Sequence, residues 1–328
     1  MRLQSLLTLI NGTLLNKPAI NSFDGLSFSS SKVKRGNLYV SMNGNFFDEA
    51  VHNGAYVILY DKDIQITDKE IAWVRVSSLE NALVKLIRYY LSEKNILGFN
   101  IDIKTHSLLK SLSCDTKLFY LDDLEEQSVE KLYKLSNNSI VLSTDKKLLG
   151  KFFSQTHPLL TNTTPLQIKS KEVFYVSFIY KNIYYDRVQI SSFFIPSLQS
   201  LISLFEENEI KFSLKQIYTS SHFELQFIDR FLNSKDFGKS ERAIIFEKDI
   251  SLAKDIFIYF QKNAPWAHVI GLFPDKIDLD NSLNYIKTSE IPILLSNERF
   301  EYAIIAGVDK SLLENETFNL KPTQPSLI

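Results

Sequence analysis

Hydrophobic and polar positions along this chain follow two periods in turn, one typical of helices and one typical of buried strands. Leu3–Ile10 and Leu79–Glu93 carry apolar residues at helical spacing, which predicts amphipathic helices. The continuous apolar runs at 55–60 and 243–246 are typical of strands that are buried on both faces. Because segments of the two kinds alternate through the whole chain, the sequence predicts an α/β protein.

The other expected elements continue this alternation. We expect further strands at 38–42, 73–76, 117–121, 139–145, 173–180, 184–190, 268–273, 291–295 and 302–307, and further helices at 47–53, 128–135, 195–207 and 250–262. Grouped by the loops between them, these elements predict domains at 1–94, 95–217 and 218–314, followed by a disordered tail at 315–328.

Composition narrows the possible classes of function. Hydrophobic residues make up 45% of the chain and charged residues 23%, which is ordinary for a soluble globular protein. The 37 basic and 38 acidic residues leave a net charge of −1, so no basic surface for nucleic acid is expected. No apolar stretch reaches the length of a membrane span, and a single cysteine fits a reducing compartment. We therefore expect a cytoplasmic protein.

The stretch 95–112 contains most of a nucleotide-binding motif. Compared with G-x-x-x-x-G-K-[ST], it offers Gly98, Lys104 and Thr105 at the right spacing, but Ile103 stands where the second glycine belongs. That glycine lets the backbone approach the phosphates closely, in a conformation that a β-branched side chain resists. Two interpretations follow: a relic phosphate-binding loop, or a buried strand that leads directly into an amphipathic helix. The chain has only 10 glycines, which favours the second.

A second motif lies in the first sixty residues. The string S-S-S-K-V-K-R-G-N-L-Y-V-S-M-N-G at 29–44 is followed by F-D at 47–48 and by N-G-A at 53–55. This string resembles the N-terminal domain of the Mur ligases, the ATP-dependent ligases that add amino acids to UDP-N-acetylmuramoyl peptides. The members that it resembles most are those that add D-alanyl-D-alanine or diaminopimelate. The resemblance implies a three-domain Mur-ligase-like architecture.

The resemblance also implies a site for a UDP-sugar. Ser30, Gly44, Phe47 and Asp48 match positions of the family's substrate-binding motifs. Ser31, however, replaces the arginine of the family's D-S-R triplet, and the G-H-D-F that follows in the family is missing. An arginine lost from such a site removes a bidentate contact to phosphate. Any remaining precursor site is therefore expected to be a relic.

The later parts of the chain resemble the family more faintly. The resemblance implies a shortened central domain of the P-loop type and a small Rossmann-like C-terminal domain. Between Leu121 and Ser139 there is no room for the family's metal-binding glutamate or its carbamylated lysine, and Phe193 and Phe194 stand where the family has polar contacts. Phosphoryl transfer depends on Mg²⁺ and on cationic side chains. We accordingly expect no metal site and assign no catalytic residue.

Three hypotheses of function follow. The first is a catalytically degenerate pseudoenzyme linked to peptidoglycan precursor synthesis, with no cofactor, that acts as a binding or scaffold partner. Its partner would be another Mur ligase, a cell-wall or cell-shape protein, or the UDP-muramoyl precursor itself. The second is an active ATP-dependent ligase that uses ATP and Mg²⁺ to add an amino acid or dipeptide to a UDP-N-acetylmuramoyl peptide. The third is a plain protein-interaction module. Fold-level analogy alone does not decide among them.

Overall fold

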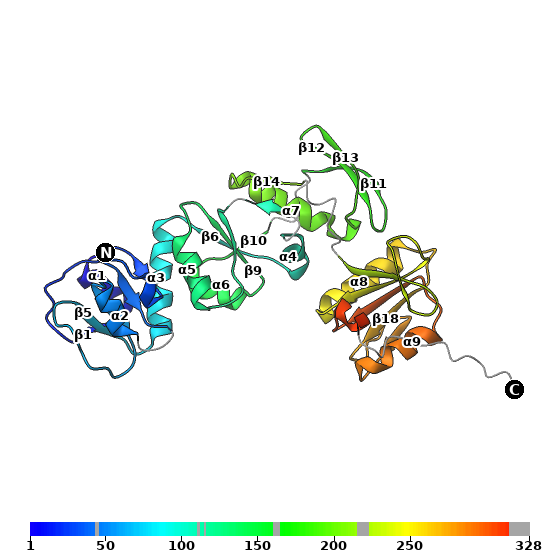
Figure 1. Ribbon diagram of the computed structural model, residues 1–328. Coiled ribbons are helices and arrows are strands. Elements are labelled where there is room, and N and C mark those ends of the chain that lie inside the picture. Colours follow the sequence, from blue (N-terminus) through cyan, green and yellow to red (C-terminus); the bar gives the residue numbers. More distant parts are fainter. Residues whose placement is uncertain (43–45, 110–111, 115, 160–164, 215–222, 315–328) are drawn as a thin grey trace. The chain divides into compact units, whose positions relative to one another are not determined.

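A computed structural model describes residues 1–42, 46–109, 112–114, 116–159, 165–214 and 223–314 (Figure 1). The chain divides into two compact units. Unit 1 comprises residues 1–102, 114–159 and 207–211, and unit 2 comprises residues 103–113, 160–206 and 212–328. The predicted domain boundaries at 94, 217 and 314 stay a prediction, and both residue 217 and the predicted tail at 315–328 lie outside the described residues.

Unit 1 contains two sheets. The five-stranded sheet has the order β1-β5-β4-β3-β2, in which β2 to β5 are parallel and β1 is antiparallel. The four-stranded sheet has the order β10-β6-β9-β8 and is parallel throughout. The strands are β1 (Thr13–Leu14), β2 (Leu26–Ser27), β3 (Leu38–Val40), β4 (Val57–Tyr60), β5 (Ala72–Arg75), β6 (Leu97–Asn100), β8 (Leu118–Tyr120), β9 (Ile140–Ser143) and β10 (His157–Pro158).

Two hydrophobic core clusters, of which the smaller contains Ala50, join these sheets to the helices of unit 1. The helices are α1 (Leu3–Ile10), α2 (Phe47–His52), α3 (Leu79–Glu93), α5 (Glu126–Lys134) and α6 (Lys146–Phe152), with the 3-10 turn η1 (Ser30–Lys32). Helix α3 begins where the Ser78 side chain accepts the N–H of Asn81, and its buried residues Leu83, Leu86 and Ile87 recur at helical spacing. It packs against α1, α5 and α6, so one continuous core joins both sheets.

Unit 2 contains an antiparallel meander, β11-β12-β13, and a six-stranded sheet of the order β16-β15-β17-β20-β18-β19. Its helices are α4 (Ile103–Leu109), α7 (Ile195–Glu207), α8 (Ile250–Asn263) and α9 (Ile291–Asn297), with the 3-10 turns η2 (Ser192–Phe194), η4 (Thr288–Glu290) and η5 (Lys310–Glu314). Its strands are β11 (Gln167–Lys171), β12 (Val176–Tyr180), β13 (Ile183–Val188), β14 (Phe212–Ser213), β15 (Glu224–Ile228), β16 (Ser234–Lys235), β17 (Arg242–Glu247), β18 (Val269–Phe273), β19 (Ser282–Asn284) and β20 (Tyr302–Ala306). The remaining strand is β7 (Ser113–Cys114).

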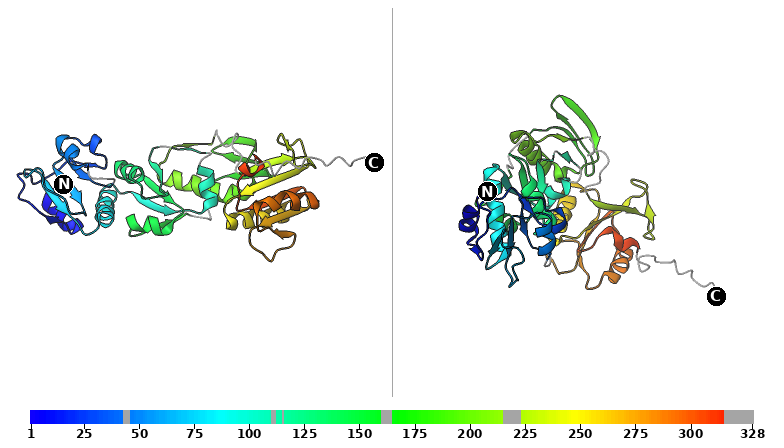
Figure 2. Two further views of the ribbon diagram at one scale, coloured as in Figure 1. Left: turned by 60° about the horizontal axis from the view of Figure 1, so that its bottom comes forward. Right: turned by 60° about the vertical axis from the view of Figure 1, so that its left-hand side comes forward.

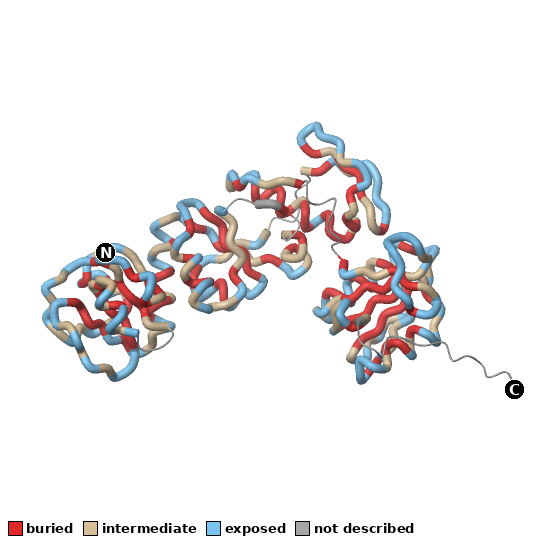
Figure 3. The backbone as a smooth tube through the Cα atoms, viewed as in Figure 1, coloured by how far each residue is buried: buried red, intermediate tan, exposed pale blue. Residues whose placement is uncertain are grey.

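The six-stranded sheet is covered on both faces (Figure 2). Ile244 and Phe246 of β17 point to the face of the sheet that α9 covers. Gly271 of β18 faces the other side, because a Cβ added to it would contact the Phe257 ring of α8. Since successive strand residues point to opposite faces, α8 and α9 lie on opposite sides. Buried residues accordingly run along its central strands (Figure 3). The predicted parallel sheet is confirmed for β17, β20, β18 and β19.

The predicted strand at 291–295 is wrong, because these residues form the start of α9. Pro292 lies in the first helical turn, where its missing N–H costs no hydrogen bond. Ile291 and Leu295 are both buried, and they lie one helical turn apart, whereas Ile293 between them is 55% exposed. A short apolar run does not distinguish a strand from a buried helix by itself.

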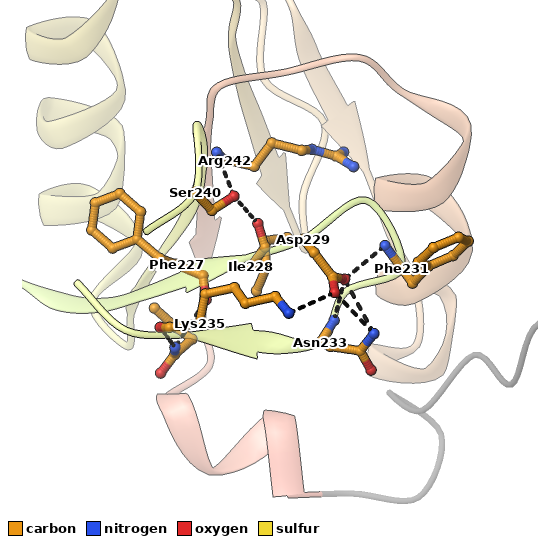
Figure 4. A network of polar contacts seen from close by, with 9 residues as sticks. Phe227, Ile228, Asp229, Phe231, Asn233, Lys235, Ser240 and Arg242 are labelled. Carbon is orange, nitrogen blue, oxygen red and sulfur yellow. Dashed lines mark hydrogen bonds and ion pairs between the residues drawn. The ribbon is translucent and has the colours of Figure 1, made fainter. Parts of the chain in front are cut away.

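The turn between β15 and β16 is organised by Asp229 (Figure 4). Its carboxylate accepts the backbone N–H groups of Phe231 and Asn233, both at 2.9 Å, and lies 3.2 Å from the Lys235 ammonium. Burial raises the pKa of this carboxyl, but the hydrogen bonds from Asn233, Phe231 and Lys235 outweigh it and lower the pKa to about 2. Asp229 is thus a structural carboxylate, ionised at neutral pH.

Candidate functional site

The stretch that resembles a phosphate-binding loop begins inside a strand. Gly98 is the second residue of β6 and pairs with Val141 of β9. The Phe153 ring packs directly against it, because a Cβ at this position would lie 2.6 Å from a ring carbon. Gly98 does not have the positive φ of the left-handed region. The contact with Phe153 gives this glycine a structural reason that involves no phosphate.

The connection from β6 to α4 is short. β6 ends at Asn100 and α4 begins at Ile103, so Ile101 and Asp102 alone connect them. The backbone N–H of Ile101 donates to the carbonyl of Ser143 at 3.0 Å, which uses it in the sheet. A phosphate-binding loop turns several successive N–H groups toward one point. Here the backbone between strand and helix offers few such groups.

Lys104 and Thr105 lie in the first turn of α4. The Lys104 ammonium stands 4.0 Å from the centroid of the Phe193 ring of η2, in a cation–π contact. Thr105 is buried, with 3% of its surface exposed, whereas Ile103 beside them is 41% exposed. The structure therefore directs the lysine charge onto an aromatic ring. The sequence comparison predicts that Phe193 takes the place of one of the family's polar contacts, and this stays a prediction. Binding of phosphate by Gly98, Lys104 and Thr105 stays a prediction.

Ser30 lies in a small polar cluster. It is buried in η1, and its hydroxyl donates to the Glu49 carboxylate of α2, while Asn53 donates to its carbonyl at 3.0 Å. Burial raises the pKa of the neighbouring Tyr39 phenol, and the carboxylates of Glu126 and Glu49 raise it further. The cluster therefore presents a carboxylate and a neutral phenol. Sequence reasoning did not single out Glu49, although it lies in the first turn of a predicted helix.

The remaining predicted precursor-site residues have separate surroundings. Phe47 packs edge-to-face against Tyr60 and Trp73, with both pairs of ring centroids 6.0 Å apart, so this half-buried ring packs against the core. Asp48 is exposed in the first turn of α2, where its carboxylate interacts favourably with the positive end of the helix dipole. Gly44 lies outside the described residues. A role for these residues and Ser30 in binding a UDP-sugar stays a prediction.

A cavity of about 340 Å³ lies at the carboxyl ends of two parallel strands of unit 1. Ser41 and Met42 follow β3, and Asp61 and Lys62 follow β4. Asp61 accepts the backbone N–H of Leu79 at 3.1 Å. Ligands of open α/β sheets bind outside the carboxyl ends of the strands. Sequence reasoning missed this cavity: Asp61 and Lys62 directly follow a predicted strand, but Ser41 and Met42 were placed inside the strand predicted at 38–42, which ends at Val40.

Within the described ranges, no group of three or more His, Cys, Asp or Glu side chains is placed to hold a metal ion. In the acidic run before α5, Asp123 instead accepts the N–H of Glu125 at 2.9 Å. The hydrogen bond from Ser128 is the main cause that lowers the pKa of Asp123. In the same described part of the chain, no helix is long and apolar enough to cross a bilayer.

Comparison with known proteins gives a partial match to a Mur ligase. The chain is 30% identical over 99 residues to UDP-N-acetylmuramoyl-L-alanyl-D-glutamate–2,6-diaminopimelate ligase 2 of Clostridium acetobutylicum. The resemblance to the Mur ligases is confirmed. The match covers 28% of this chain and only 20% of the length of that curated relative. No protein-family model matches the chain.

Solved structures give a fainter likeness over a longer range. The MurF ligase of Thermotoga maritima in complex with ADP aligns with 92% of this chain and 98% of its own, at 10% identity and a TM-score of 0.45. The ligase for UDP-N-acetylmuramoylalanyl-D-glutamyl-2,6-diaminopimelate and D-alanyl-D-alanine of Acinetobacter baumannii aligns with 97% of this chain and 88% of its own, at 12% identity and the same TM-score of 0.45. Scores of this size do not by themselves assign a function.

Proposed function

We propose that this chain is a Mur-ligase-like protein of peptidoglycan precursor synthesis that has lost ligase chemistry and acts as a binding or scaffold partner. The observation that carries the proposal is the two-residue connection of Ile101 and Asp102 between β6 and α4. Phosphoryl transfer consists almost entirely of positioning the phosphates and neutralising their charge. A connection with few free backbone N–H donors can do little to position the phosphates or to neutralise their charge.

Two further observations support the loss of catalysis. The Lys104 ammonium contacts the Phe193 ring, so binding a triphosphate would require this contact to break. Asp102, in the connection that precedes Lys104, would also place a negative charge beside a bound triphosphate. If ATP and Mg²⁺ were bound, Lys104 and Thr105 would be the residues to hold them.

The retained role that we propose is recognition. The cavity at the carboxyl ends of β3 and β4 is the candidate site that we favour for a precursor fragment, if one is bound. Glu49 beside Ser30 adds negative charge to the predicted UDP-sugar site, which disfavours an anionic ligand there. Partners of protein nature, namely another Mur ligase or a cell-wall or cell-shape protein, are therefore favoured over the UDP-muramoyl precursor.

Thermal unfolding with and without Mg²⁺-ATP tests the proposal, because a ligand that binds only the folded state raises its stability. We expect no shift of the midpoint with Mg²⁺-ATP for the wild type, for Lys104→Ala or for the control Lys169→Ala, an exposed lysine of β11. A shift that is lost in Lys104→Ala and kept in Lys169→Ala would overturn it. So would ATP-dependent amide formation by the purified protein.

A second arm uses a UDP-N-acetylmuramoyl peptide in the same measurement. A shift with this precursor alone would support a pseudoenzyme that binds the precursor. No shift with either ligand would support a protein partner, and cross-linking to Mur ligases in cells would then identify it.

The alternative is an active ATP-dependent ligase. Lys104 and Thr105 lie in the first turn of a helix that follows a parallel strand, which is where a phosphate-binding loop has them. This alternative predicts release of ADP that depends on Mg²⁺, on an amino acid or dipeptide and on a UDP-N-acetylmuramoyl peptide acceptor.

A further inference from the structure

A larger cavity, of about 690 Å³, lies elsewhere in unit 1. Its residues come from α3, from the start of β6 and from the segment that leads from α6 to β10. Leu97 and Gly98 mark its position at the amino end of β6, whereas Lys104 and Thr105 of the stretch that resembles a phosphate loop follow the carboxyl end. It shares Phe152, and no other lining residue, with the cavity beside β3 and β4. The two cavities are separate candidate sites.

The charged side chains that line this cavity are all positive. Lys85 and Arg88 of α3 line it, and none of its described lining residues is Asp or Glu. Neither cation has an ion-pair partner within the part of the chain that the structure describes, although Glu80 on the same helix pairs with Lys151 at 2.7 Å. Two like charges three residues apart weaken a helix. Their uncompensated charge favours an anion from solution.

The other walls of the cavity are apolar or can form hydrogen bonds. Phe152 and Phe153 contribute buried rings, and Tyr89, next to Arg88, is 38% exposed. Ser92 and Gln155 add polar side chains. A volume of several hundred Å³, with apolar walls and a few polar groups, is typical of sites for small molecules.

We propose that this cavity binds a small organic anion that joins an anionic group, such as phosphate, to an apolar ring. Lys85 and Arg88 hold the anionic group, because a guanidinium and an ammonium one turn apart can both reach it. Tyr89 and Phe153 contact the ring. This inference does not depend on the proposed function, since it uses none of Gly44, Lys104 or Thr105 and no ATP.

Calorimetric titration of the full chain with phenyl phosphate tests the proposal. Inorganic phosphate serves as the probe for the anionic group alone, and benzyl alcohol for the ring alone. We expect phenyl phosphate to bind with a Kd of about a millimolar, as suits a ligand of this size, and inorganic phosphate to bind about tenfold more weakly. Benzyl alcohol should give no measurable heat. An absence of phenyl phosphate binding would overturn the proposal.

Matched variants locate the site. Lys85→Gln and Arg88→Gln should each weaken phenyl phosphate binding about tenfold, since each removes one charged contact. Lys146→Gln, an exposed lysine of α6 that does not line the cavity, should leave binding unchanged. Unfolding midpoints equal to that of the wild type confirm that the variants fold. Binding that is equally strong in all three variants, or that all three weaken equally, would overturn the proposal.

Discussion

Replacing Gly98 with alanine is expected to destabilise unit 1, because the new methyl group has no space. The added Cβ would lie 2.6, 2.7 and 3.0 Å from three carbons of the Phe153 ring, whereas carbon atoms in contact lie about 3.5–4.0 Å apart. Phe153 belongs to the continuous core of unit 1, so turning its ring toward the neighbouring cavity would give up core contacts. The strand or the ring must therefore shift.

The expected cost follows from two opposing effects. Overpacking a core by one methyl group costs about 1–3 kcal/mol. Gly98 has a backbone conformation that alanine also adopts, so the substitution regains about 0.4–1 kcal/mol by restricting the unfolded chain. The net loss in free energy of unfolding is about 1–2 kcal/mol. For a unit of this size this lowers the unfolding midpoint by about 2–8 °C.

Tryptophan fluorescence provides the assay, because the chain has 2 tryptophans, one in each unit. Trp73 of unit 1 is fully buried and Trp266 of unit 2 is 70% exposed. In a Trp266→Phe background, the emission of Trp73 reports the unfolding of unit 1 alone. Gly150→Ala is the matched control. Gly150 lies inside α6, and its added Cβ meets no described atom within 4 Å, so alanine should stabilise that helix by about 0.5–1 kcal/mol.

A companion substitution tests the cause of the effect. Phe153→Leu removes the ring that the new methyl group meets, so Gly98→Ala should cost about 1 kcal/mol less in that background than in the wild type. A midpoint for Gly98→Ala within about 1 °C of the wild type would refute the packing argument. Equal costs in both backgrounds would refute it as well.

Two further predictions concern unit 2. Asp229→Asn should lower the free energy of unfolding by about 2 kcal/mol at neutral pH, because the folded-state pKa of Asp229 is about 2 against about 3.9 in the unfolded chain. This stabilisation is present above about pH 4 and is lost as the pH falls toward 2, so a urea-unfolding difference that persists unchanged at about pH 2.5 would contradict it. Phe174→Ala should lower the free energy of unfolding by about 2–4 kcal/mol, since the Phe174 ring contacts four other aromatic rings. The control Tyr184→Ala removes a largely exposed side chain and should change this free energy little. Equal unfolding midpoints for the two variants would contradict this prediction.

Local sequence alone determined several elements of this protein. The bounds of α3 and α7 agree with prediction, since apolar residues at helical spacing continue through each helix and end with it. The strands β17, β18 and β20 were also predicted, because continuous apolar runs of their length mark strands buried on both faces. β15 and β16 were missed, since β16 is exposed and only Phe227 and Ile228 of β15 are buried, which gives no such run.

The candidate sites depended on contacts that sequence spacing does not contain. The spacing of Gly98, Lys104 and Thr105 fits a phosphate-binding loop, but the pairing of β6 with β9 places Gly98 inside a strand. Likewise, a helical wheel places Lys85 and Arg88 on neighbouring positions of α3 without showing the segment that completes their cavity. The spacing of apolar residues shows which face of a helix or strand is buried, because side chains close together in sequence point in directions that repeat with a fixed period. What covers that face is decided by residues far away in sequence, and only the tertiary structure brings them together.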